Sequence, residues 1–281
     1  MPIDPKRSRL TFQKLGRELT KLVKKPAPES VHKFRTNSRR VEALLSEVVV
    51  ESRRNDEKLL RLLARLRKKA GRVRDLDVQI ASLRSLKIPG GNSHKSQFMG
   101  ALVEERAQRE KKLARAFDRK TADEIRRRLK RASTRMAIPA DTEPLTLTLA
   151  KLAQLGRDYV PLTEKTLHQY RIIGKRARYI AELSDSEPEA KRVVDRLKHM
   201  QDVIGDWHDW LKLTQKAEDL IGDVRDSALV AMLRNITQAK FRQSLDAVAE
   251  IRSELAGKIL RPTSQARKPA REDAARSAAV A

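Results

Sequence analysis

Residues 31–48, VHKFRTNSRRVEALLSEV, carry two different faces on what their spacing predicts to be one helix. At 100° per residue, His32, Arg35 and Arg39 fall within about 60° of one another. The apolar side chains fall on the opposite side, at Phe34, Val41, Leu44, Leu45 and Val48. We therefore expect a helix that packs one face into a core and turns a basic face elsewhere.

A second stretch repeats this pattern in the other half of the chain. Residues 167–181 read LHQYRIIGKRARYIA, and histidine again opens the basic face. The bases of this second face are His168, Arg171, Lys175 and Arg178. The apolar positions opposite them are Tyr170, Ile173, Ala177, Ile180 and Ala181. The second face has no intervening carboxylate, whereas solvated helix faces usually mix the two signs.

The two stretches are part of a longer repetition. His32, Arg35, Arg39 and Arg40 recur as His168, Arg171, Lys175 and Arg176, at an offset of about 136 residues. Gly71, Arg74 and Asp75 recur as Gly205, His208 and Asp209, at about 134 residues. We interpret the chain as two copies of one helical unit, related by a pseudo-two-fold axis, with the two basic faces lining one shared groove.

The rest of the chain is also typical of helices. Long segments rich in Leu, Ala, Arg, Lys and Glu lie between clustered prolines, and no stretch alternates as a strand does. The first half predicts helices at about 7–24, 29–52, 56–70, 74–87 and 95–132. The second half predicts them at about 145–158, 162–184, 188–204, 208–221 and 225–257. From residue 261 to 281 we expect a disordered basic tail.

The repeated glycines predict helix ends. Gly71 and Gly205 suit the position just after a helix, and Asp75 and Asp209 would then cap the next one. Asp77 does not make a metal pair with Asp75, because residues two apart on a helix point in nearly opposite directions.

Composition indicates the kind of partner. The 281 residues include 62 Lys and Arg against 37 Asp and Glu, a net charge of +25 that favours a polyanion. Two Trp, three Tyr and five Phe are few for a protein that stacks bases, so phosphates are the better match. The absence of cysteine excludes disulfides, thiolate metal sites and a cysteine nucleophile. Without a long apolar run or a signal-peptide core, we expect a soluble cytoplasmic protein.

Four blocks of sequence resemble the CHAD family, the conserved histidine α-helical domain. They are VHKFRTNSRR at 31–40, GRVRDLDV at 71–78, LHQYRIIGKRARY at 167–179 and LKHMQDVIGDWHD at 197–209. The resemblance implies an all-α fold of two similar antiparallel helical bundles around a basic groove or pore. It places one CHAD domain over 1–260, with halves at about 7–132 and 145–257.

The resemblance also implies a ligand, inorganic polyphosphate, which the family binds rather than turns over. The contacts it implies are His32, Arg35, Arg39, Arg40, Arg65, His168, Arg171, Lys175, Arg176, Arg178 and Lys198. Glu42 stands at the position that matches Arg178, which makes the first basic face the weaker one. No cofactor or catalytic residue is implied, and the cellular location would be polyphosphate granules.

A second domain found in many relatives, the CYTH or triphosphate-tunnel domain, is not expected here. Its E-x-E-x-K signature occurs at Glu187, Glu189 and Lys191, but at the start of a predicted helix and without barrel strands around it. We expect a stand-alone CHAD protein.

Other interpretations stay open at the level of sequence. The basic faces could be solvated helix faces, and the histidines could be packing residues near helix starts. A sequence-tolerant nucleic-acid-binding protein is the main functional alternative, since +25 would attract DNA or RNA. An enzyme is disfavoured because no phosphate-binding glycine loop or paired nucleophile is found. A scaffold for acidic proteins is a further alternative.

Overall fold

Helices account for nearly all of the computed structural model, which describes residues 3, 5–24, 27–49, 53–88, 93–158, 162–184, 187–222 and 227–259. Over these residues there are nine α-helices and no strand, which confirms the all-α class. In the first half of the chain they are α1 (Pro5–Lys24), α2 (Pro28–Glu47), α3 (Arg54–Ser85), α4 (Ser93–Ala116) and α5 (Arg119–Arg135). In the second half they are α6 (Pro144–Asp158), α7 (Glu164–Ala181), α8 (Pro188–Ile221) and α9 (Ala228–Ile259), with the short 3₁₀ helix η1 (Glu182–Ser184) after α7.

Two apolar cores organise these helices into two groups. In one, α1, α2, α5 and the first half of α3 surround the fully buried side chains of Phe34, Val41 and Leu44. In the other, α6, α7, the first half of α8 and the second half of α9 surround Tyr170 and Ala177. The expected apolar faces of the two quoted stretches therefore lie in the cores. The duplication and its two-fold relation stay predictions from the sequence.

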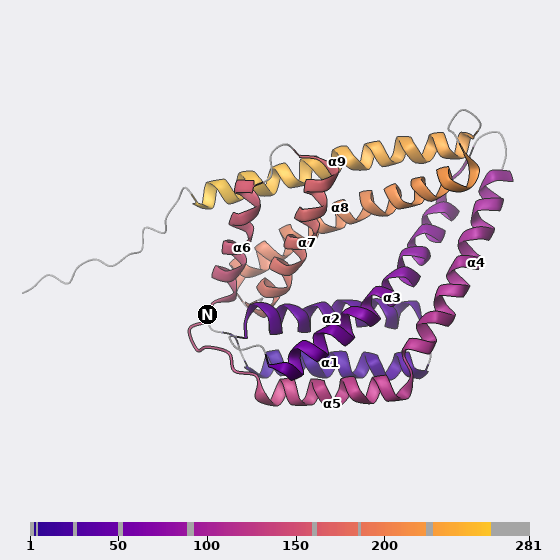
Figure 1. Ribbon diagram of the computed structural model, residues 1–281. Helices are drawn as coiled ribbons and strands as arrows, with labels where there is room; N and C mark the ends of the chain where they lie inside the picture. The colour runs from indigo at the N-terminus through magenta and orange to yellow at the C-terminus, as the bar shows by residue number, and fades with distance from the viewer. Residues whose placement is uncertain are drawn as a thin grey trace, which may run out of the picture.

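A third core joins the two groups at the far ends of the long helices. The second half of α3 pairs with α4, and α8 pairs with α9 (Figure 1). The tips of these two hairpins meet through Leu76, Phe98, Leu213, Leu229 and their neighbours. The two groups thus contact each other at this junction and again where α2 meets α7.

The prediction that Gly71 and Gly205 end helices was wrong. Both lie inside continuous helices, α3 and α8, and neither Asp75 nor Asp209 caps a helix. Helix stability in a bundle comes mainly from tertiary packing, and the third core continues the buried face beyond each glycine. Among the described glycines, Gly222 at the end of α8 has a positive φ, of 94°.

The single helix expected at 95–132 was also wrong, because the structure has α4 and α5 there. Asp118 begins α5 by accepting a hydrogen bond from the Thr121 amide at 2.6 Å. Phe117 turns inward at the same point, and its ring packs edge-on to Phe34 with centroids 5.1 Å apart. The Asp-x-x-Thr spacing was the available signal for this helix start.

Two further expectations concern the E-x-E-x-K string and the C-terminal tail. Glu187 precedes α8, and Glu189 and Lys191 lie in its first turn, so this string has no part in a strand. The tail expected at 261–281 lies outside the described residues.

Candidate functional site

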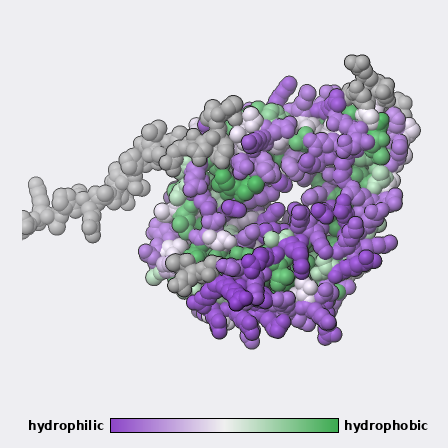
Figure 2. Space-filling view, in the orientation of Figure 1, coloured by the Kyte–Doolittle hydropathy of each residue, from purple (hydrophilic) through white to green (hydrophobic). Residues whose placement is uncertain are grey.

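The two basic faces predicted from the sequence meet where α2 packs against α7. The helices contact each other directly, and a cavity of about 320 Å³ lies between them. We call the cavity between α2 and α7 the central cavity. The bases that line it are Arg39, Arg67, Arg171, Lys175 and Arg176. Figure 2 shows that the surrounding face of the molecule is mostly hydrophilic and is hollowed near its middle.

The carboxylates of the central cavity are already neutralised by partners. Glu42 pairs with Arg67 at 2.8 Å, and Glu47 pairs with Lys151 at 2.7 Å. Among the described residues, Arg39, Arg171 and Lys175 form no ion pair. Within the described part of the chain, the cavity therefore holds cations in excess, and its two carboxylates, Glu42 and Glu47, are already paired.

Lys175 is the most perturbed of these cations. Burial, followed by the charges of Arg171, Arg39 and Arg35, lowers the pKa of Lys175 to about 6. Asp209 opposes this shift without cancelling it. Lys175 therefore favours its neutral form above about pH 6, and an anion placed beside it would favour the charged form.

Arg171 lies beside Lys175 with part of its donor capacity unused. Its Nε is buried and has no hydrogen-bond partner among the described residues. Burial lowers the pKa of Arg171, but a guanidinium remains charged. A buried charged donor without an acceptor is costly, and a phosphate oxygen would supply that acceptor.

Arg35 is the corresponding residue of α2, and it is already engaged. Its Nη1 donates to the Gly71 carbonyl oxygen at 3.4 Å and to Asp75 Oδ1 at 3.3 Å. The guanidinium carbon lies 3.6 Å from the point where a Cβ on Gly71 would stand. The Gly-x-x-x-Asp spacing on α3 thus leaves room for Arg35 and supplies its acceptors.

The histidines stand beside these bases. Partial burial, followed by the charges of Arg74 and Arg35, lowers the pKa of His32. Partial burial, with His208 and Arg171 next in effect, lowers the pKa of His168. The His168 and His208 ring centroids are 6.3 Å apart. His32 and His168 therefore favour the neutral form, and a polyanion bound nearby would favour their protonated form.

With this geometry in place, the comparisons with known proteins identify the family. The model of the CHAD domain family matches residues 9–216. The chain belongs to the CHAD domain family. This family is known generally to bind polyphosphate, and its members are generally non-catalytic binding domains.

Solved structures show the same fold as this CHAD domain. PptA from Streptomyces chartreusis matches with a TM-score of 0.68 and 14% sequence identity, over 89% of this chain and 99% of that chain. The crystal structure of the CHAD domain from the plant Ricinus communis matches with a TM-score of 0.66 and 16% identity, over 88% of each chain. No curated protein sequence matches the chain.

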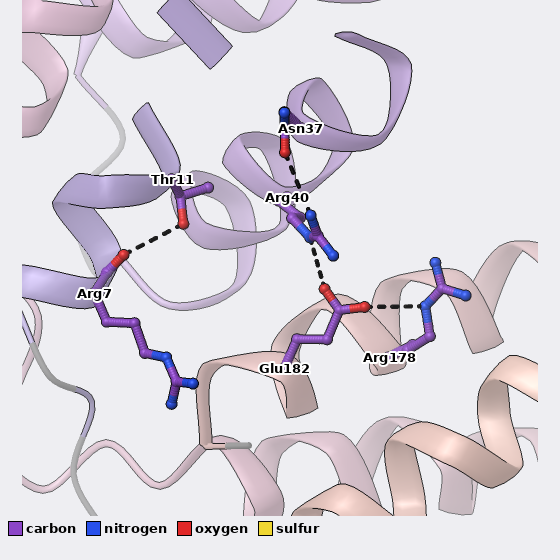
Figure 3. Close-up of polar contacts among 6 residues, drawn as sticks. All are labelled: Arg7, Thr11, Asn37, Arg40, Arg178 and Glu182. Atoms are coloured by element: carbon purple, nitrogen blue, oxygen red, sulfur yellow. Dashed lines mark hydrogen bonds and ion pairs between the residues drawn. The ribbon is translucent and has the colours of Figure 1, made fainter. Parts of the chain in front are cut away.

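Arg40 and Arg178 occupy a different place in the CHAD domain from the central cavity. Glu182 lies between them, accepting a hydrogen bond from Arg40 Nε at 2.7 Å and forming an ion pair with Arg178 Nε at 3.3 Å (Figure 3). Arg40 also donates to Asn37 Oδ1 at 3.3 Å. These two predicted contacts form a bridge between α2 and α7–η1.

The remaining predicted residues are on the surface. Arg176 is exposed at the edge of the central cavity, whereas Arg65 on α3 and Lys198 on α8 are exposed and do not line it. Three bases near the faces were missed by the sequence analysis. Arg74 and His208 belong to the repeated Gly motif, which was interpreted as structural. No sequence pattern distinguishes Arg67 from the other arginines of α3.

The described residues contain no group of three or more His, Cys, Asp or Glu side chains arranged to hold a metal ion. None of the described helices is long and apolar enough to cross a membrane.

Proposed function

We propose that this protein binds inorganic polyphosphate in the central cavity without turning it over. The observation that carries the proposal is the convergence of Arg39 from α2 with Arg171 and Lys175 from α7, all without ion pairs among the described residues. The chemistry of the family points to the same ligand.

Polyphosphate suits this site better than nucleic acid does. The polymer carries charge on every unit, and guanidinium and ammonium groups form charge-assisted hydrogen bonds with its oxygens. It has no bases, and the central cavity offers one aromatic side chain, Tyr179, among its lining residues. Many such contacts along one chain act together, so long chains should bind far more tightly than orthophosphate.

The test is a competition experiment at fixed salt. Labelled long-chain polyphosphate is displaced by unlabelled polyphosphate, double-stranded DNA, pyrophosphate or orthophosphate. We expect long polyphosphate to compete best and its affinity to fall steeply with salt through counterion release. DNA competing as well as polyphosphate would favour the nucleic-acid alternative, and pyrophosphate competing as well would contradict an extended site.

Turnover and location are tested separately. Incubation with long-chain polyphosphate should release no orthophosphate and should not shorten the chains. In a cell that makes polyphosphate, the tagged protein should co-localise with the granules and disperse when the polymer is removed by a polyphosphatase.

A further inference from the structure

A second basic depression lies between α1 and α2. Its volume is about 500 Å³, larger than that of the central cavity. We call it the α1–α2 cleft. Its basic lining residues are Lys14, Arg17, Lys21, His32, Lys33 and Arg40.

Two of these cations are available to a ligand, a third is held only by an exposed ion pair, and Arg40 is already paired with Glu182. Lys14 and Arg17 are exposed and form no ion pair among the described residues. Lys33 pairs with Glu29 at 2.6 Å, but these side chains are 49% and 77% exposed, and such surface pairs exchange easily for a better anion. The one carboxylate in the lining, Glu18, already accepts a hydrogen bond from Lys21 at 3.0 Å.

Two observations place the cleft close to the central cavity, on neighbouring parts of α2. His32 lines the cleft and also lies close enough to Arg35 and Arg39, on the inner face, to feel their charges. A smaller depression of about 230 Å³ runs from Lys14 and Arg40 to Tyr179, which also lines the central cavity.

We propose that the α1–α2 cleft is a second phosphate-binding subsite, which holds further units of a polyphosphate chain that already occupies the central cavity. This proposal rests on the function proposed above. A chain of few phosphates fills the central cavity alone, whereas a long chain continues past His32 into the cleft. The second contact is then intramolecular, so it raises the affinity for long chains and leaves that for short chains unchanged.

The test compares two chain lengths in a variant of the cleft. Lys14→Ala/Arg17→Ala removes two exposed positive charges from helix α1, where alanine is well tolerated. Lys111→Ala/Lys112→Ala on α4 is the matched control, because it removes the same charge from exposed helical positions away from the cleft. Affinities for inorganic triphosphate and for long-chain polyphosphate are measured with each variant and with the wild type.

For Lys14→Ala/Arg17→Ala we expect about 5- to 10-fold weaker binding of long-chain polyphosphate and unchanged binding of triphosphate. The slope of log affinity against log salt should become shallower by about 1–2 for the long chain. The control should change either affinity less than about 2-fold.

Three results would overturn the subsite. They are full affinity for the long chain in the cleft variant, an equal loss for both chain lengths, and an equal loss in the control. Failure of the function itself is different: the wild type would then bind neither form, or Arg171→Ala/Lys175→Ala would bind both as well as the wild type.

Discussion

Glu182 accepts a hydrogen bond from Arg40 at 2.7 Å, and this contact links residues 142 positions apart in the chain. The carboxylate also meets Arg178, so one negative charge holds two guanidinium groups where α2 approaches α7. Two bases that the sequence assigned to ligand binding thus stabilise the contact between the two halves.

Replacing Glu182 should destabilise the fold. Glu182→Gln leaves Arg178, whose side chain is only 15% exposed, without its counter-charge. Removing one partner of a largely buried ion pair leaves the other charge without compensation. We therefore expect the free energy of unfolding to fall by about 1–3 kcal/mol. Urea denaturation measures this. Glu29→Gln, in an exposed pair, is the control and should leave stability unchanged; equal effects of the two changes would mean that the bridge contributes nothing.

The two basic faces should contribute unequally to binding. Arg35 already has Asp75 and the Gly71 carbonyl as acceptors, whereas Arg171 and Lys175 form no ion pair within the part of the chain that the structure describes. Arg171→Ala/Lys175→Ala should therefore weaken polyphosphate binding about tenfold more than Arg35→Ala/Arg39→Ala does. Circular dichroism checks that both variants fold. The opposite order would show that the first face is the stronger one.

Lys175 should make stability depend on pH. With a folded-state pKa of about 6 and an unfolded value near 10.4, the unfolded chain binds the extra proton between these limits. Stability therefore rises with pH across that window. Lys175→Met should unfold at a higher temperature than the wild type, with the largest gain at or below pH 6. The gain should shrink towards pH 10, and a constant gain would contradict the lowered pKa.

Binding should take up protons at neutral pH. A polyanion raises the pKa of Lys175 and of the histidines at 32 and 168, so affinity should increase as pH falls from 8 to 6. Lys175→Arg, which stays charged, should reduce this dependence, and His32→Gln/His168→Gln should reduce it further. Titration calorimetry in buffers of different ionisation heat counts the protons. An unchanged pH profile in the histidine variant would identify those residues as structural.

The interior glycine of α8 should be replaceable. A Cβ on Gly205 would meet no atom within 4 Å, so Gly205→Ala should raise the free energy of unfolding by about 1 kcal/mol through helix propensity. Gly222→Ala, at a φ of 94°, should lower it. Thermal denaturation compares the two. Destabilisation by Gly205→Ala would mean that the helix does end there, as the sequence motif suggested.

The separation of apolar and basic faces was predictable from the sequence. Phe34 and Leu44 are fully buried as expected. Arg39, Arg171 and Lys175 line one cavity, as the helical spacing of the two basic faces implied. Such faces follow from the helical period, which depends only on local spacing. The repeated Gly–Asp motif was also visible, although its role was not.

The partner of each face was decided by the tertiary structure. Nothing local indicates that Glu182 reaches Arg40, or that α3 and α8 continue through their glycines to a third core. The pKa of Lys175 depends on guanidinium groups from both α2 and α7, which approach only when the two helices pack. Spacing along a helix determines which side chains share a face, but charge and burial depend on which faces meet, and that is set by packing between segments far apart in the chain.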